Sequence, residues 1–143
     1  MVKPKSTAMG FEIKYESGFY RIEVDAGSGL LSAKWLRPVS ADEIIRGGTK
    51  LYEVLQETQV ERVVANAQAL GALTSEAKEW MSTRFYELLS GTSLKKMARV
   101  LPDTVFHRIA LESVVTRAEA LGITKFLVKN FSRQQEALLW LDF

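Results

Sequence analysis

The second half of the chain alternates short apolar runs with amphipathic stretches, and this alternation constrains its fold more than any other feature. Apolar runs at 62–67, 96–101 and 125–128 have the length and composition of strands, and stretches with helical spacing separate them. Strands joined through helices run parallel, and the crossovers are nearly always right-handed. We therefore predict a parallel βαβ core from residue 61 onward.

Helices complete this pattern after each strand. We expect one over residues 74–89, one that begins near residue 103, and a last one that Ser132 and Gln135 cap. Because each would pack on the sheet, the second half alone accounts for three helices.

The first half of the chain reads as three extended segments, at 11–15, 20–25 and 31–36, with glycine-containing turns between them. Within the second segment apolar and charged residues alternate, as in a strand with one buried face. Short turns between neighbouring strands indicate an antiparallel meander. The meander would add antiparallel members to the parallel core and give one mixed sheet.

A fourth helix is expected directly after Pro38, which ends the third extended segment. Ser40 and Glu43 have the Ser-x-x-Glu spacing in which both side chains bond free amides at a helix start. Gly47 and Gly48 fall in the middle of this helix, where each glycine costs about 1 kcal/mol relative to alanine. Either the helix is weak there or something packs closely against its backbone.

Length and composition indicate one α/β domain over residues 11–143, preceded by a flexible arm at 1–10. A chain of 143 residues with 47% hydrophobic residues can bury a single core without metals or disulfides. Cysteine is absent, which excludes disulfides, thiolate catalysis and cysteine-ligated metal sites.

The charge distribution argues against polyanion binding. Basic and acidic residues number 19 and 17, are scattered along the chain and leave a net charge of +2. We expect no nucleic-acid partner. Since no apolar run approaches the roughly 18 residues that cross a bilayer, we also expect no membrane span and a cytoplasmic location.

Three local motifs carry a resemblance to a known family. They are residues 33–35 at the end of a strand, residues 69–76 with Trp80 downstream, and residues 136–141. With the order of elements, they make residues 11–141 similar to the STAS domain, the SpoIIAA-like fold of bacterial anti-sigma factor antagonists, and to small STAS/SEC14-like bacterial proteins. The resemblance implies a mixed sheet with four helices and a regulatory or protein-interaction role.

The resemblance also singles out Thr74 and Ser75 as a candidate phosphoacceptor or partner-docking site. Antagonists carry Asp-Ser-Ser-Gly here, whereas this chain has Leu73 and Glu76 in place of the aspartate and the glycine, and Asn66 where small relatives often have aspartate. The structural alternative is that a Thr74 hydroxyl caps the following helix. A phosphate at this helix start would add about two negative charges beside Glu76 and could eject an acidic partner.

No catalytic, cofactor or metal site is expected. His107 is the single histidine and lies among apolar neighbours of a helix, which is typical of an ordinary half-buried residue. The carboxylates show no spacing that marks a general acid and base. An enzyme that uses His107 with a distant acid remains the third hypothesis.

Basic and aromatic residues leave two further choices open. The basic group forms either a solvated surface or a small patch for an anion or acidic partner; it consists of Lys95, Lys96, Arg99, Arg108 and Arg117. The aromatic residues either fill the core or line an apolar pocket; they include Trp35, Trp80, Trp140, Phe85, Tyr86, Phe106 and Phe126.

Our leading hypothesis is a non-enzymatic interaction module that binds an unknown protein partner or a second copy of itself. Its docking surface would include the loop at 70–75 and the helix at 74–89. The alternative is a domain that binds a small apolar, lipid-like molecule, as in SEC14-like relatives.

Overall fold

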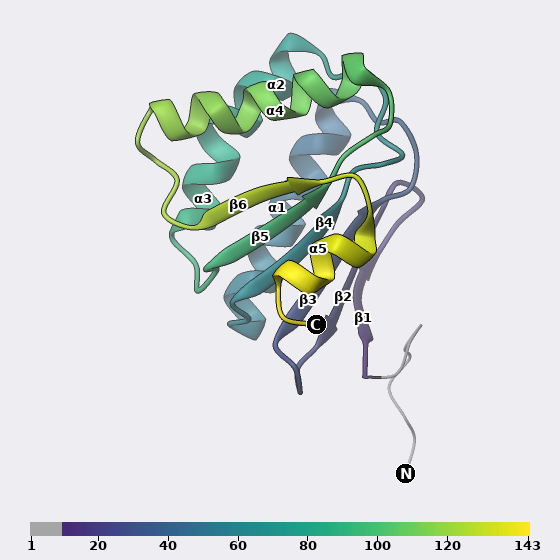
Figure 1. Ribbon diagram of the computed structural model, residues 1–143, viewed down its shortest axis with the longest axis vertical. Helices are drawn as coiled ribbons and strands as arrows, with labels where there is room; N and C mark the ends of the chain where they lie inside the picture. Colours follow the sequence, from purple (N-terminus) through teal and green to yellow (C-terminus); the bar gives the residue numbers. More distant parts are fainter. Residues whose placement is uncertain (1–9) are drawn as a thin grey trace.

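The computed structural model describes residues 10–143. Residues 1–9 of the arm expected at 1–10 therefore lie outside the described residues. A six-stranded sheet in the order β1-β2-β3-β4-β5-β6 forms the centre (Figure 1). Neighbours β1 to β3 pair antiparallel, and β3 to β6 pair parallel. The strands are β1 (Glu12–Glu16), β2 (Tyr20–Asp25), β3 (Leu30–Trp35), β4 (Arg62–Asn66), β5 (Lys96–Val100) and β6 (Leu127–Phe131). The predicted mixed sheet is confirmed.

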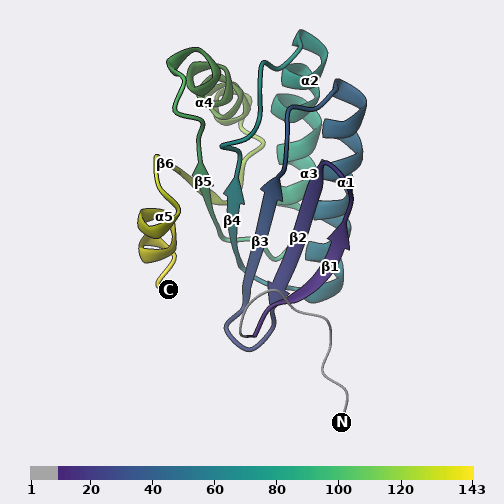
Figure 2. The same ribbon diagram turned by 90° about the vertical axis from the view of Figure 1, so that its right-hand side faces the viewer.

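Helices cover both faces of the sheet, as Figure 2 shows for α1, α2 and α3 on one side and α5 on the other. The helix α4 buries apolar side chains in the same core as α1. Because α2, η1 and α3 follow each other without a gap, the helices form the four segments that the sequence predicts. Their bounds are α1 (Ala41–Thr58), α2 (Ser75–Trp80), η1 (Met81–Phe85), α3 (Tyr86–Ser90), α4 (Val105–Ala120) and α5 (Gln134–Trp140).

The start of α1 confirms the predicted capping box. The Ser40 hydroxyl accepts from the Glu43 N–H at 3.2 Å, and the Glu43 carboxylate accepts from the Ser40 N–H at 3.0 Å. Arg37 adds a second tie, with Nη2 2.8 Å from Glu43 Oε2. The Arg37 hydrogen bond, followed by the one from Ser40, lowers the pKa of the Glu43 carboxyl to about 2. The loop after β3 is thus fixed to the first turn of α1.

Two boundaries near the C-terminus differ from the prediction. The last strand begins two residues later and ends three later than expected, because its pairing with β5 starts at Leu127 opposite Lys96. This edge strand contains polar residues, so its sequence lacks a clear apolar run. The last helix has Arg133 at its N-cap and no side-chain cap, so the expected cap at Ser132 is wrong. Near this helix start, buried Asn66 donates to the Gln134 side chain at 3.0 Å, which ties α5 to β4.

Candidate functional site

A small cavity of about 40 Å³ lies between the sheet and the helices α1 to α4 that cover one of its faces. Its walls come from β2 to β5, from α1 and α4, and from the continuous segment α2–η1–α3. We call it the aromatic chamber. Five aromatic side chains line it: Tyr20, Trp35, Trp80, Phe85 and Tyr86.

The aromatic chamber depends on the two glycines of α1. A Cβ on Gly47 would lie 2.6 Å from Cη2 of Trp35, and one on Gly48 would lie 2.8 Å from Cη2 of Trp80. Both separations are too short for any other residue without movement of the rings. The close approach that the sequence left as one of two choices is therefore the observed one, and the helix continues through both glycines.

A π-helical turn interrupts the helix that the sequence predicts as continuous over 74–89. The Tyr86 N–H donates to the Met81 carbonyl, five residues earlier, across the turn η1. The extra residue per turn brings the neighbours Phe85 and Tyr86 both to the chamber wall. Single π-turns inside α-helices are rare and often occur at functional sites.

Arg99 of β5 also belongs to the chamber wall, so the solvated-surface alternative is wrong for this residue. The residue is only 4% exposed. Its Nη1 donates to the Tyr86 hydroxyl at 3.2 Å, and its Nη2 donates to the Leu111 carbonyl at 2.6 Å. Both acceptors are neutral, and no carboxylate of residues 10–143 forms a salt bridge with Arg99. Within residues 10–143, its positive charge therefore has no ion-pair partner.

The other members of the predicted basic group do not gather into one patch. Lys95 and Arg117 form exposed ion pairs with Glu61 at 3.3 Å and Glu79 at 2.7 Å. Lys96 lies over a tryptophan ring on the opposite face of the sheet. The group is therefore mostly a solvated surface, and Arg99 alone has a distinct environment.

Two tyrosines add hydroxyl groups to the aromatic chamber. Burial raises the pKa of the Tyr20 hydroxyl far above its ordinary value, and the nearby Tyr86 adds to the rise. Tyr20 therefore keeps its proton and remains a neutral donor. On the neighbouring strand β6, Asn130 is the register partner of Arg99 and lines a separate hollow with Arg108 and Glu112. Its side-chain oxygen is buried without a hydrogen-bond partner within the described chain.

Thr74 and Ser75 lie at the start of α2, away from the buried surface. Both residues are exposed, and the Thr74 hydroxyl accepts from the Ala77 N–H at 3.1 Å. The structural alternative for Thr74, a helix cap, is thus observed. Leu70, in the same predicted docking loop, is 3% exposed and packs in the core. The role of Thr74 and Ser75 as phosphoacceptor or docking site stays a prediction.

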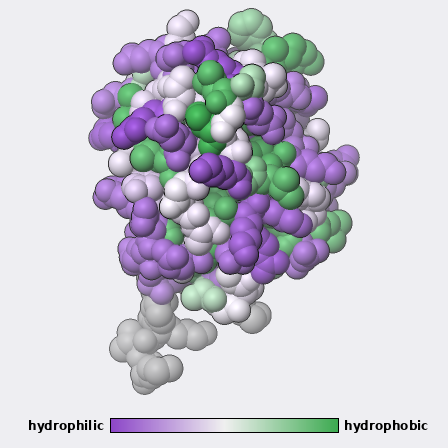
Figure 3. Space-filling view, turned by 90° about the vertical axis from the view of Figure 1, so that its left-hand side faces the viewer, coloured by the Kyte–Doolittle hydropathy of each residue, from purple (hydrophilic) through white to green (hydrophobic). Residues whose placement is uncertain are grey.

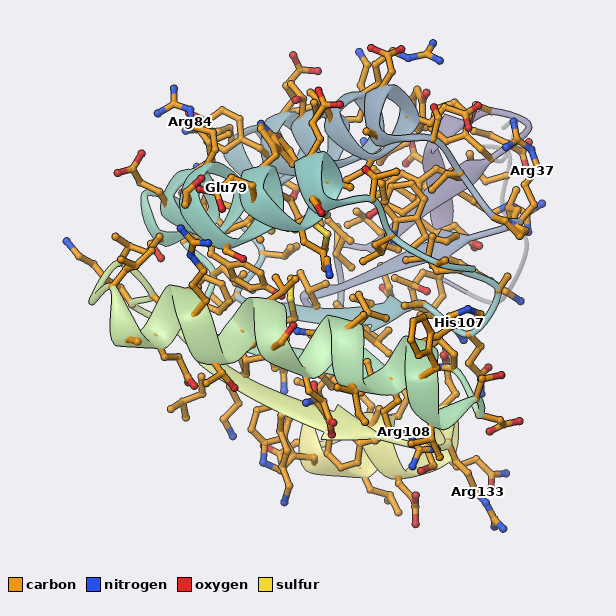
Figure 4. The ribbon with its side chains drawn as sticks, turned by 90° about the horizontal axis from the view of Figure 1, so that it is seen from above. Arg37, Glu79, Arg84, His107, Arg108 and Arg133 are labelled. Carbon is orange, nitrogen blue, oxygen red and sulfur yellow. The ribbon has the colours of Figure 1, made fainter. Side chains whose placement is uncertain are left out.

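His107 lies on the first turn of α4, on the same side of the molecule as Arg37, Arg108 and Arg133, as Figure 4 shows. It is half-buried, as expected, and its ring meets the Phe106 ring edge-on at 5.9 Å. Between residues 10 and 143, no group of three histidine, aspartate or glutamate side chains could hold a metal ion.

Exposed hydrophobic residues gather on the first turns of α4. Val105, Phe106 and Ile109 are 64%, 73% and 57% exposed. Elsewhere the surface is mixed: the face drawn in Figure 3 carries green hydrophobic patches that purple hydrophilic residues interrupt. Among the described helices, none is long and apolar enough to cross a membrane.

Comparison with known proteins identifies the fold and nothing finer. No family model and no curated protein matches the sequence. The chain is similar to the crystal structure of an uncharacterised protein of the DUF3478 family, with a SpoIIAA-like fold, from Shewanella loihica PV-4. The two share 17% sequence identity with a TM-score of 0.52, over 92% of this chain and 91% of the other. The SpoIIAA-like fold, which the sequence motifs predict, is confirmed.

Proposed function

We propose that this chain is a non-enzymatic binding module that takes a small apolar molecule into the aromatic chamber. The observation that carries the proposal is the chamber itself: five aromatic rings around an unfilled space, under a π-helical turn. Ligand pockets are typically concave, lined by apolar and aromatic side chains, and placed between helices and a sheet. The SEC14-like branch of the resemblance supports the same class of ligand.

Binding requires the aromatic chamber to open. Its volume of about 40 Å³ is far below the roughly 300–1,000 Å³ of ordinary ligand pockets. The segment α2–η1–α3 is the part best suited to move, because Trp80 is only half-buried and touches α1 at a glycine. The ion pair between Glu79 and Arg117 ties the segment to α4, and both side chains are more than half exposed. Exposed pairs contribute little, so this tie is weak.

Titration with octan-1-ol and with octanoate tests the proposal, followed by tryptophan fluorescence because Trp35 and Trp80 both line the aromatic chamber. We expect saturable binding of at least one of the two probes. Ala65→Val adds two methyl groups at the chamber wall and should weaken that binding at least about tenfold. The matched control, Ala120→Val on the exposed surface of α4, should leave it unchanged.

The outcomes separate cleanly. Binding that Ala65→Val removes and Ala120→Val keeps places the probe in the aromatic chamber. Absence of saturable binding by either probe contradicts the proposal, and so does binding that both variants leave intact.

A second candidate function, docking of another protein, is supported by the exposed side chains Val105, Phe106 and Ile109. Apolar side chains grouped on one exposed helix turn are typical of interaction surfaces. The occupant we propose is a second copy of this chain, since the exposed groups are apolar and need no charged complement. Sedimentation equilibrium should then give a dimer that Phe106→Ser converts to a monomer. A monomer for the unchanged chain at all concentrations rules this candidate out.

A further inference from the structure

We infer that the ligand of the aromatic chamber carries a carboxylate, or an equivalent monoanionic group, which Arg99 binds. This inference rests on the proposed function and specifies the chemistry of its ligand. The ligand class is a small amphipathic acid, with an apolar body among the rings and an anionic end at the guanidinium.

The uncompensated charge of Arg99 is the first argument. Arginine is almost never fully buried unless it is paired, because removing a charge from water is costly. Here the side chain is 96% buried, as its 4% exposure implies, and its hydrogen bonds reach only a hydroxyl and a carbonyl. Leucine or methionine would fill the same space without that cost. A ligand carboxylate supplies the partner that the described chain lacks.

The orientation of the guanidinium is the second argument. Tyr86 on α3 and Leu111 on α4 hold its two terminal nitrogens from two different helices. A guanidinium has five N–H donors, so these two hydrogen bonds use only part of them. A fixed planar fork at an apolar wall is the arrangement that recognises a carboxylate, and exclusion of water strengthens the contact.

Asn130 adds a second incompletely bonded polar group on the same face of the sheet, at a separate hollow that Arg108 and Glu112 also line. It is the cross-strand partner of Arg99 in the parallel register, so both side chains leave the sheet on the same face. Its side-chain oxygen is buried and accepts no hydrogen bond from any described residue. Buried polar atoms are nearly always satisfied, and an orphan one calls for a missing partner. Within the described residues, Arg99 and Asn130 therefore both lack part of their bonding on this face of the sheet, and Arg99 is the one that lines the aromatic chamber.

A purely structural role for Arg99, tying α3 and α4 to β5, predicts no preference among ligands. The experiment therefore compares probes of one length that differ only at the end group: octanoate, octan-1-ol and octylammonium. For the unchanged chain we expect octanoate to bind about ten- to a hundredfold more tightly than octan-1-ol, the range expected of a charged hydrogen bond. Octylammonium should bind most weakly.

Arg99→Met tests the assignment of the residue. It should lower octanoate affinity about tenfold or more and leave octan-1-ol within about threefold. Arg133→Met, an exposed change at the start of α5, is the control and should alter neither. The ranking of the three probes is measured on the unchanged chain. It therefore tests the carboxylate inference even if Arg99→Met fails to fold.

Each outcome has one meaning. Equal affinity for octanoate and octan-1-ol overturns the carboxylate inference and leaves the proposed function standing. A preference for octanoate that Arg99→Met retains overturns the role of Arg99. If no probe binds, the proposed function fails, and the inference fails with it.

Discussion

The two faces of the sheet differ in the size and composition of the clusters of side chains that they bury. Beneath α1 to α4 lies a large core with stacked aromatic rings, a cavity and a buried arginine. Beneath α5 lies a small cluster of aliphatic residues, almost all fully buried; its members are Leu30, Val64, Ala98, Val100, Ala137 and Leu141. Both faces belong to the same six strands, so the difference comes from what the helices bring to each.

The contrast indicates which side chains of this fold serve mainly its stability and which do not. Protein interiors are normally packed to the density of organic crystals with few voids. On the α5 face, a hollow of about 430 Å³ lined by Leu30 and Val64 lies beside the cluster and is open to the surface. The helix-rich face departs from that rule within its core, at the aromatic chamber that Arg99 lines. Departures from local packing rules are expected at functional sites.

The largest contrast should come from removing one large side chain on each face. Leu141→Ala, in the α5 cluster, should lower the free energy of unfolding by about 2–5 kcal/mol, because the residue is fully buried. Trp80→Ala removes more atoms but should cost less, since the ring is half-buried beside an existing cavity. Urea denaturation of both variants measures the two values. A larger loss for Trp80→Ala contradicts the comparison.

Adding atoms should give the opposite asymmetry. Ala98→Val, on the α5 face, should overpack a closed cluster and cost about 1–3 kcal/mol. Ala65→Val, on the neighbouring strand but at the chamber wall, has room for the added methyl groups and should be neutral or stabilising. Thermal unfolding of the matched pair decides the point, and equal losses would show that the aromatic chamber has no usable space.

The two glycines of α1 sharpen the comparison within the helix-rich face. Gly47→Ala drives a methyl group into the stacked pair Tyr20 and Trp35, whose ring centroids are 3.9 Å apart. After the helix gain from alanine, we expect a net loss of about 1 kcal/mol. Gly48→Ala meets the Trp80 ring, which is less buried than Trp35, and should be close to neutral. Chemical denaturation measures both, and a greater loss for Gly48→Ala means that Trp80 is fixed in place.

The smallest expected effect is on how the free energy of unfolding depends on pH. The pKa of the Glu43 carboxyl is about 2 in the folded chain against an ordinary 4.5, so its ionised form stabilises the fold above pH 4.5. That contribution is lost as the pH falls from 4.5 to 2. Denaturation curves of Glu43→Gln should therefore start below those of the unchanged chain at pH 7 and converge with them near pH 2. A constant gap at all pH values would contradict the Arg37–Glu43 tie.

Most elements of the fold follow from local patterns in the sequence. The period-two run at 20–25, the capping box at Ser40 and the alternation after residue 61 each act over a few residues. The strand, the cap and the order of elements are found as the sequence predicts, and only the bounds of the last strand shift by two to three residues. The glycine pair in α1 already pointed to a close neighbour, although the sequence could not say which ring would occupy the space.

The candidate site was less accessible from the sequence. Its basic neighbours in the sequence predict that Arg99 belongs to a solvated surface or to a small anion-binding patch. The residue lies between Ala98 and Val100 in a central parallel strand, which is buried on both faces. That position was the signal that could have found it. The π-turn at Met81–Phe85 has no sequence signature, and the late start of β6 depends on pairing with β5. Each of these features is set by tertiary contacts.

Hydrogen–deuterium exchange tests most directly whether the helix-rich face holds a chamber that opens. In the free protein, amides of residues 75–90 should exchange faster than those of β4 and β5, because local opening draws on the least constrained segment. Octanoate should slow exchange over the same residues and leave the α5 face unchanged. Exchange at 75–90 that is as slow as in the central strands, and that octanoate does not alter, would contradict the account.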